Sequence, residues 1–134
     1  MNVLLVCRGV SGSGKSTFAN FLKEIYPQAT ICCADDYFMK DGNYTFDASK
    51  IGKAHGYSFY TFAQAVERRD KLIIIANTNT CKDEFKKYEE YVKDKDYKII
   101  YTVIENRHGN KDVHSVPPET IKKQRERLKN SIQL

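Results

Sequence analysis

The chain alternates between short, continuous apolar runs and segments in which apolar residues recur at helical spacing. Four of the runs are typical of buried strands, because a strand covered on both faces lacks the apolar–polar alternation of a half-exposed one. These runs are Val3 to Cys7, Thr30 to Ala34, Leu72 to Ala76 and Lys98 to Ile104. The pattern therefore predicts a sheet with both faces covered.

Helical spacing predicts a helix after each strand. The predicted helices are Lys15 to Ile25, Ala48 to Arg69, Lys82 to Lys95, and Pro117 to Asn130. Pro27 ends the first because proline cannot donate the helical hydrogen bond, and Asp47 is the predicted N-cap of the second. Two sets of residues are expected to face the core, Phe18, Ala19, Phe21, Leu22 and Ile25 in the first helix and Tyr57, Phe59, Tyr60 and Phe62 in the second. Base stacking is the alternative for the second set, and the same two interpretations apply to Tyr44 and Phe46.

Strands that alternate with helices predict an α/β fold, a parallel sheet joined by right-handed crossovers. Residues 1–134 are interpreted as one domain with one site. Two polar gaps, Lys40 to Asp47 and Glu105 to Ser115, are predicted to be loops over that site. The second gap is the candidate for a mobile lid.

Composition indicates what the chain binds and where it is located. The net charge of +5 and the pI near 9.0 favour an anionic partner, which nucleic acid or a nucleotide would satisfy. No apolar run approaches the roughly 20 residues needed to span a bilayer, and the N-terminus is interpreted as a strand and not a signal peptide. The four cysteines lack the spacing of a zinc site or a disulfide framework, so we expect a cytoplasmic protein. Because no apolar run is long enough to span a bilayer, we expect no membrane association.

The segment GVSGSGKS follows the first predicted strand and opens the first predicted helix. Its spacing is G-x-x-x-x-G-K-[ST], in which glycines let backbone N–H groups curl around phosphate oxygens. Lys15 is expected to reach the β- and γ-phosphates of ATP, and the Ser16 hydroxyl to ligate Mg²⁺. The residues predicted to bind ATP are Gly9, Ser11, Gly12, Ser13, Gly14, Lys15, Ser16 and Thr17.

Other motifs separate the classes that share this loop. A switch GTPase would carry an N-K-x-D guanine signal after the later strands, and a motor ATPase an acidic residue at the end of the third strand; the sequence has Asn77-Thr78-Asn79 there. A kinase fits better. Asp35 follows the second strand and is the candidate general base, since a carboxylate there can accept the proton of an attacking hydroxyl. The alternative is that Asp35 or Asp36 caps the next turn.

Four segments in this order, GVSGSGKST, ADDYF, IIIANTNT and HSVP before a basic final helix, resemble the polynucleotide 5′-hydroxyl kinase family of P-loop phosphotransferases. The resemblance covers nearly the whole chain. It implies a four-stranded sheet with the order 2-3-1-4 and the roles given above for Lys15, Ser16 and Asp35. The sequence departs from the family at Phe38, where the phage-type kinases carry an arginine, and at Ala76-Asn77, where an acidic residue is common.

Further residues are assigned to the site from their position. Asp36, His55, Asn77 and Asn79 are candidate contacts to the substrate, with a purely local backbone role as the alternative for the two asparagines. The resemblance implies a lid arginine that stabilises the transferred phosphoryl group. Arg107 is the first candidate, Lys111 and Arg125 are alternatives, and the basic run of the final helix is otherwise a solvated face.

The sequence therefore predicts an ATP-dependent kinase that uses Mg²⁺ and phosphorylates a 5′-hydroxyl end of RNA or DNA, a reaction of nucleic-acid repair. Two alternatives remain. One is a kinase for a small hydroxylated molecule, such as a nucleoside, with the same loop and base. The other is a non-catalytic nucleotide-binding module, which the missing acidic residue at Ala76-Asn77 keeps open.

Overall fold

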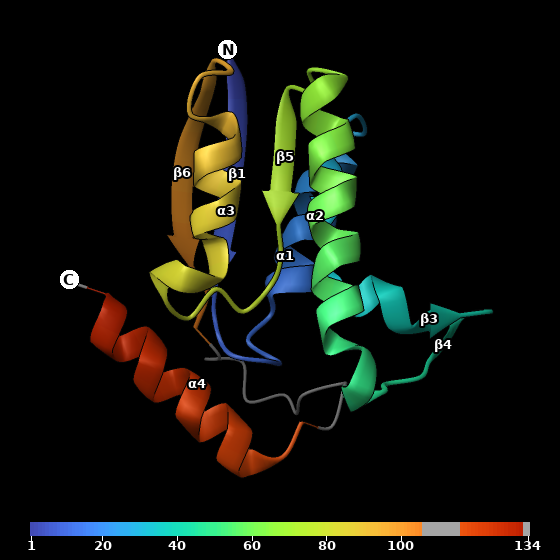
Figure 1. Ribbon diagram of the computed structural model, residues 1–134, viewed down its shortest axis with the longest axis vertical. Helices are drawn as coiled ribbons and strands as arrows, with labels where there is room; N and C mark the ends of the chain where they lie inside the picture. Colours follow the sequence, from blue (N-terminus) through green and yellow to red (C-terminus); the bar gives the residue numbers. More distant parts are fainter. Residues whose placement is uncertain (106–115, 133–134) are drawn as a thin grey trace.

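A computed structural model describes residues 1–105 and 116–132 of the chain. Its centre is a parallel four-stranded sheet with the strand order β2-β5-β1-β6 (Figure 1). The strands are β1 (Asn2–Arg8), β2 (Thr30–Cys32), β5 (Leu72–Ile75) and β6 (Tyr97–Val103). Counted along the chain, these are the first, second, third and fourth predicted strands. The predicted α/β class and the predicted order 2-3-1-4 are both confirmed.

The two central strands are apolar on both faces because helices cover both faces of the sheet. Leu4 and Val6 of β1 and Ile73 to Ile75 of β5 have no exposed surface. The register pairs Val3 with Leu72 and Val6 with Ile75, so the two strands end at the same edge of the sheet. The segments that follow them therefore emerge side by side.

The described residues form four α-helices and two 3₁₀ helices around the sheet. They are α1 (Lys15–Ile25), α2 (Ile51–Glu67), α3 (Lys82–Val92) and α4 (Pro118–Ser131), with η1 (Ala34–Phe38) and η2 (Ala48–Lys50). Figure 1 shows α2 and α3 on one face of the sheet, with α1 behind it, while α4 crosses below the strand ends. None of the described helices is long and apolar enough to cross a membrane.

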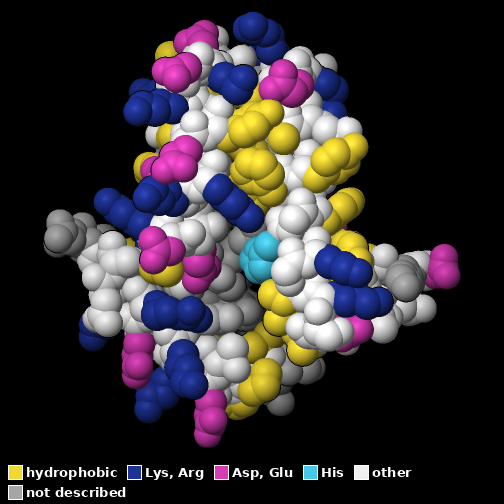
Figure 2. Space-filling view, viewed as in Figure 1, with side chains coloured by type: hydrophobic (Ala, Val, Ile, Leu, Met, Phe, Trp, Pro, Cys, Tyr) yellow, Lys and Arg dark blue, Asp and Glu magenta, His cyan; other side chains and the backbone are white. Residues whose placement is uncertain are grey.

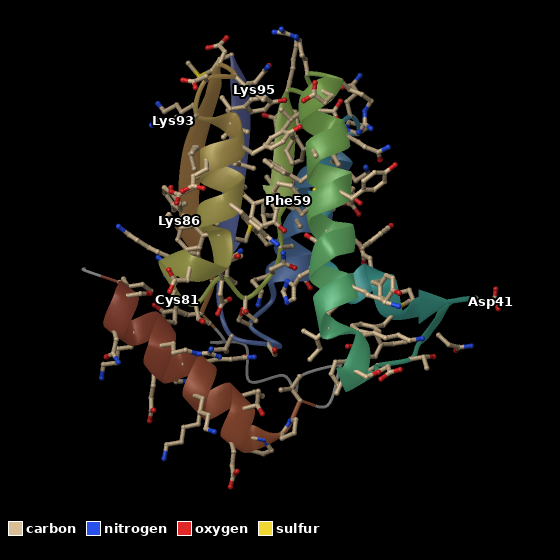
Figure 3. The ribbon with its side chains drawn as sticks, viewed as in Figure 1. Asp41, Phe59, Cys81, Lys86, Lys93 and Lys95 are labelled. Atoms are coloured by element: carbon tan, nitrogen blue, oxygen red, sulfur yellow. The ribbon has the colours of Figure 1, made fainter. Side chains whose placement is uncertain are left out.

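The two faces of the sheet carry separate apolar cores. Phe62 of α2 and Phe85 and Tyr88 of α3 pack against Leu4 and Ile73 on one face. Phe59 lies between α2 and α3 (Figure 3) and packs at the margin of this core. On the other face, Ala19 of α1 packs in a cluster with the alternate strand residues Leu5, Cys7, Ile74 and Ala76.

Both predicted helical faces are wider than the observed ones. In α2 the buried residues Ser58, Phe62, Ala65 and Val66 follow the helical repeat, which leaves Tyr57 and Tyr60 44% and 60% exposed. In α1, Ala19 is buried, whereas Phe21 and Ile25 are 58% and 52% exposed. The core prediction was wrong for these four exposed residues, because periodicity does not reveal how much of a helix its neighbours cover.

The boundaries of the second predicted helix also change. Residues 48–50 form η2, α2 begins at Ile51, and Asp47 caps η2 by accepting a hydrogen bond from the Ser49 N–H at 3.0 Å. The preceding predicted loop contains a hairpin of β3 (Met39–Lys40) and β4 (Asn43–Tyr44). Asp41 and Gly42 connect the strands with positive φ angles of 50° and 80°, which the two-residue turn of such a hairpin requires. Asp41 marks its tip in Figure 3.

The final helix is fastened to the sheet by a buried arginine at the end of β1. The Arg8 guanidinium donates to the Asn79 carbonyl at 2.8 Å, the Thr80 carbonyl at 3.2 Å and the Ser131 hydroxyl at 2.5 Å. It also lies 5.0 Å from the centre of the Phe85 ring. Arg8 therefore joins β1, the segment after β5 and the last turn of α4.

Candidate active site

The connection between β1 and α1 is a tight phosphate loop that depends on its glycines. Gly12 and Gly14 have φ angles of 78° and 106°, which side chains other than glycine rarely tolerate. A Cβ on Gly9 would lie 2.5 Å from both the Ile104 carbonyl oxygen and the Ser13 hydroxyl. The loop therefore curls beside the end of β6, and Lys15 begins the helix as the sequence predicts.

Lys15 is folded against this loop and is only 7% exposed. Its ammonium donates to the carbonyl oxygens of Gly9 at 2.8 Å and Val10 at 2.7 Å, and lies 3.5 Å from the Ser13 hydroxyl. These contacts hold a positive charge at the mouth of the loop. An anion entering the loop meets both the ammonium and the positive end of α1.

A cavity of about 1210 Å³ opens over the carboxyl ends of the strands. In the face shown in Figure 2 the surface is hollowed beside the cyan histidine. The residues from Ser11 to Thr17 of the phosphate loop line the cavity, and because the loop follows the inner strand β1 it lies between the segments that follow the edge strands β2 and β6. One end is lined by residues after β2 and from α2, among them Asp35 and His55. The opposite end is lined by residues after β6 and from α4, among them Ile104 and Gln124.

Asp35 and Asp36 differ in their surroundings although they are neighbours in η1. Asp35 is half-buried, lines the cavity, and accepts a hydrogen bond from the Tyr44 hydroxyl at 3.3 Å. Asp36 is exposed and lies outside the lining of the cavity. The structure therefore brings Asp35, the candidate base, to the same cavity as Lys15, and leaves Asp36 at the surface.

Asn77 follows β5 and is 8% exposed. Its side-chain oxygen accepts a hydrogen bond from the Ala34 N–H at 2.8 Å, and its nitrogen donates to the Ser58 hydroxyl at 3.1 Å. The Ser58 hydroxyl in turn pairs with the Tyr88 hydroxyl at 3.0 Å. Asn77 therefore fixes the residue before Asp35, which is a positioning role in addition to its place on the cavity wall.

Asn79 is nearly fully buried and ties two strand ends together. Its amide nitrogen donates to the carbonyl oxygens of Cys7 at 2.7 Å and Asn77 at 3.1 Å. Its φ angle is 48°, and its side-chain oxygen has no hydrogen-bond partner among the residues that the structure describes. Asn79 is not among the described residues that line the cavity, and its contacts hold the backbone of the site, which agrees with the local role given as the alternative; its contact with a substrate stays a prediction.

Glu84 lies outside the cavity lining but holds the segment after β5, a positioning role that sequence reasoning missed. This residue of the first turn of α3 accepts hydrogen bonds from the Thr78 hydroxyl at 3.0 Å, the Thr80 N–H at 3.2 Å and the Thr80 hydroxyl at 2.6 Å. Its carboxylate also lies 3.9 Å from the Arg127 guanidinium of α4. A carboxylate is thus present near the end of β5, although it comes from the next helix. The acid three residues after Cys81, a helix N-terminus signature, was the available signal.

Of the three histidines, the described part of the chain includes His55. It extends from α2 and lines the cavity near Asp35 and Tyr44. Burial lowers the pKa of His55, and the Lys87 ammonium lowers it further, while Glu84 and Asp35 partly oppose this shift. The imidazole is therefore neutral at pH 7 and able to donate one hydrogen bond and accept another.

The basic candidates fall into two groups. Arg107 and Lys111, together with most of the predicted lid, lie outside the described residues. Arg125 is exposed on α4, as are Lys122 and Lys123. Gln124, between them, was not a candidate, yet its side-chain oxygen accepts a hydrogen bond from the Ser11 N–H of the phosphate loop.

Known proteins resemble this chain in sequence and in fold. Human NEDD4-binding protein 2 is 38% identical over 99 residues, which are 74% of this chain and 6% of that protein. No family model matches the chain. A chain of the Pnkp1/Rnl/Hen1 RNA repair complex superposes with a TM-score of 0.70 and 18% identity, over 97% of this chain and 45% of that one.

A second solved structure matches over nearly its whole length. The APS kinase CysC of Mycobacterium tuberculosis superposes with a TM-score of 0.54 and 10% identity, over 96% of this chain and 97% of that one. The chain thus spans a small part of the human relative, less than half of the RNA repair chain and almost all of the APS kinase chain. It has the fold of a P-loop kinase, which confirms at the level of the fold the resemblance to the polynucleotide kinases that its sequence motifs indicate.

Proposed function

We propose that this protein is an ATP-dependent kinase that transfers the γ-phosphoryl group of ATP to the 5′-hydroxyl end of RNA or DNA. One observation carries the proposal: the phosphate loop with Lys15 and the carboxylate of Asp35 line the same cavity. A phosphate donor and a proton acceptor for an incoming hydroxyl are the two parts that this reaction needs.

The two ends of the cavity suggest where each substrate binds. ATP places its phosphates at the loop and its base toward the end lined by Ile104 and Gln124. The acceptor then enters at the end lined by Asp35 and His55. The two substrates meet over the carboxyl ends of β1 and β5, which is where ligands bind in open parallel sheets.

In the reaction, the acceptor oxygen forms a bond to the γ-phosphorus while the bond from that phosphorus to the β–γ bridging oxygen breaks. The hydroxyl proton passes to Asp35, and ADP leaves with the electron pair of the broken bond. Lys15 stays beside the β- and γ-phosphates and stabilises the charge that develops there. Positioning is the larger part of the work, since phosphoryl transfer needs no strong base.

Mg²⁺ would be held by the Ser16 hydroxyl together with phosphate oxygens of ATP, and it would neutralise phosphate charge. The position of Ser16 fits this role, because Ser16 is exposed and lines the cavity. The described residues contain no cluster of three His, Cys, Asp or Glu side chains able to hold a metal ion on their own, and magnesium in kinases commonly uses few protein ligands.

A kinase for a small hydroxylated molecule is the second candidate, favoured by the full-length superposition on APS kinase. Three observations favour a polynucleotide. The chain has a net charge of +5. Lys122, Lys123 and Arg125 are exposed on α4, and we place the phosphates of the strand beyond its first nucleotide along these side chains. The RNA repair chain also superposes more closely than APS kinase does.

The test is transfer of labelled γ-phosphate from ATP to a panel of acceptors. The panel contains 5′-hydroxyl RNA, 5′-hydroxyl DNA, free nucleosides and adenosine phosphosulfate. Label in the oligonucleotides alone is the expected result. Label only in a small acceptor would favour the second candidate, and ATP binding without transfer to any acceptor would favour the non-catalytic alternative.

A further inference from the structure

The cavity has apolar side chains in its wall that the phosphoryl-transfer chemistry does not require. Three large apolar side chains line the cavity and yet are exposed: Phe46 at 55%, Phe21 at 58% and Ile51 at 44%. They come from separate elements, the segment after the β3–β4 hairpin, α1 and α2. Exposed apolar side chains that converge on one cleft indicate a ligand with an apolar surface.

Phe46 belongs to an aromatic cluster that we call the hairpin cluster, formed by Phe38, Tyr44 and Phe46. The rings of Tyr44 and Phe46 are nearly parallel, with 16° between their planes and 6.5 Å between their centres. Phe38 is 5% exposed and contacts both rings at steep angles, with centres 6.1 Å from Tyr44 and 5.2 Å from Phe46. All three side chains line the cavity, and the buried Phe38 fixes the position of the two more exposed rings.

The hairpin cluster is linked directly to the candidate base. The Tyr44 hydroxyl donates its hydrogen bond to Asp35, while the Tyr44 ring lies beside Phe46. One side chain therefore connects the carboxylate that receives the 5′-hydroxyl proton with an exposed aromatic surface. In a nucleotide, one sugar lies between the 5′-oxygen and the base. A 5′-oxygen at Asp35 would therefore leave the base near the rings of Tyr44 and Phe46.

We propose that the rings of Tyr44 and Phe46 form a stacking platform for the base of the 5′-terminal nucleotide of the acceptor. This inference rests on the proposed function and adds the part of the acceptor that the protein reads. Every base presents an aromatic face, so the platform accepts any base and selects nucleotides over acceptors without a base. It also accounts for a half-exposed phenylalanine in a short polar segment.

The competing explanation is that Phe46 only stabilises the hairpin through Phe38. The two are separated by a double-mutant cycle in which one change is made in the protein and the other in the acceptor. Phe46→Ala removes the ring, and Phe46→Trp keeps an aromatic face. The acceptors are a 5′-hydroxyl dodecamer and the same strand with an abasic first nucleotide. Tyr26→Ala is the matched control, since Tyr26 is 56% exposed and outside the cavity lining.

With the ordinary strand, we expect Phe46→Ala to raise KM between about fivefold and hundredfold, the usual effect of losing one base–aromatic stack, with kcat changed little. Phe46→Trp and Tyr26→Ala stay near the wild-type KM. The abasic strand raises KM for the wild type by a similar factor, and Phe46→Ala adds no further increase. ATP affinity and the melting temperature are measured for each variant to verify that the loop and the fold are intact.

If Phe46→Ala raised KM by the same factor for the ordinary and the abasic strand, the stacking platform would be rejected, because the effect of a hairpin defect does not depend on the base. The proposed kinase function would not be affected by that result. No loss with either strand would overturn the platform as well. If the wild type phosphorylates neither strand, the proposed function itself fails and the platform fails with it.

Discussion

Gln124 of α4 accepts a hydrogen bond from the backbone N–H of Ser11 in the phosphate loop, with 2.9 Å between the side-chain oxygen and the nitrogen. The two residues are 113 positions apart in the sequence. Gln124 is 9% exposed, so little water competes for this bond. The final helix thereby restrains the loop that is proposed to bind ATP.

Removing this contact should weaken ATP binding without unfolding the protein. For Gln124→Ala we expect about a fivefold loss of ATP affinity, since a net hydrogen bond contributes about 1 kcal/mol. Gln124→Glu should lose more, because it places a carboxylate beside the phosphates. Calorimetric titration with ATP at fixed Mg²⁺ measures both, and Gln64→Ala on α2 is the control. Wild-type affinity in Gln124→Glu would mean that the helix does not affect the loop.

Replacing Lys15 with Ala removes the positive charge at the phosphate loop. Turnover should fall by about 10²-fold or more, the usual cost of losing one electrostatic group aimed at the transition state. Lys23→Ala is the control, because Lys23 also donates to a backbone carbonyl, that of Ala29, but is outside the cavity lining. Label transfer is measured together with thermal melting. An unchanged rate in Lys15→Ala would reject the assignment of the loop.

The two neighbouring aspartates offer a matched pair. Asp35→Asn should slow transfer by about 10² to 10⁴ while ATP still binds, because the proton acceptor is lost and the phosphate loop is unchanged. Asp36→Asn should have a smaller effect, since Asp36 is exposed and outside the cavity lining. Similar losses of ATP affinity in both variants would instead assign the pair to the metal or to the fold.

The dependence of acceptor affinity on salt concentration tests whether the acceptor is a polynucleotide. Each phosphate contact by a basic side chain releases counterions and steepens the fall of affinity with salt concentration. Changing Lys122, Lys123 and Arg125 together to Gln should flatten that slope for a dodecamer and leave ATP affinity nearly unchanged. The control changes Lys71, Lys93 and Lys98 to Gln; these are exposed, and Lys93 lies at the far end of α3 (Figure 3). Equal slopes for wild type and both variants would favour a small acceptor.

The histidine in the cavity provides a pH test. Because the pKa of His55 is lowered from 6.5, its NMR titration should have a midpoint below that value. Lys87→Met should raise the midpoint by removing the ammonium, whereas Lys86→Met should not, and His55→Gln identifies the signal.

The same shift in pKa makes the free energy of unfolding depend on pH. Below pH 6.5, His55 binds a proton more readily in the unfolded chain than in the folded one, so acidification favours the unfolded state and lowers the stability that is present above pH 6.5. His55→Gln should therefore lose less stability on acidification, and a midpoint at or above 6.5 would contradict the assignment.

The sequence predicted those parts of the site that are local. The phosphate loop follows from glycine spacing over eight residues, and Asp35 from its place directly after a strand. The strand order came from the family resemblance, since periodicity identifies strands but not their neighbours. These predictions needed no knowledge of which distant side chains meet.

The parts that the sequence did not predict depend on long-range contacts. Asn77 acts on the Ala34 N–H, 43 positions away, and Gln124 acts on Ser11. Glu84 was not a candidate, because nothing local in the sequence shows that the end of β5 lies beside it. The roles of Arg107 and Lys111 stay predictions, as these residues lie outside the described ones.

The layout of the cavity along the chain has a consequence for how such an enzyme can change its substrate. The described residues at the acceptor end, apart from those of α1, come from the stretch between Ala34 and His55, which connects β2 to α2. The opposite end is supplied after residue 103, by the segment after β6 and by α4. Among the described residues, those proposed to surround the first nucleotide of the acceptor and those proposed to surround the base of ATP therefore come largely from separate stretches of the sequence, with the phosphate loop between them. Exchanging the stretch after β2 for that of another P-loop kinase would redirect the phosphoryl group to a new hydroxyl while the protein continued to use ATP.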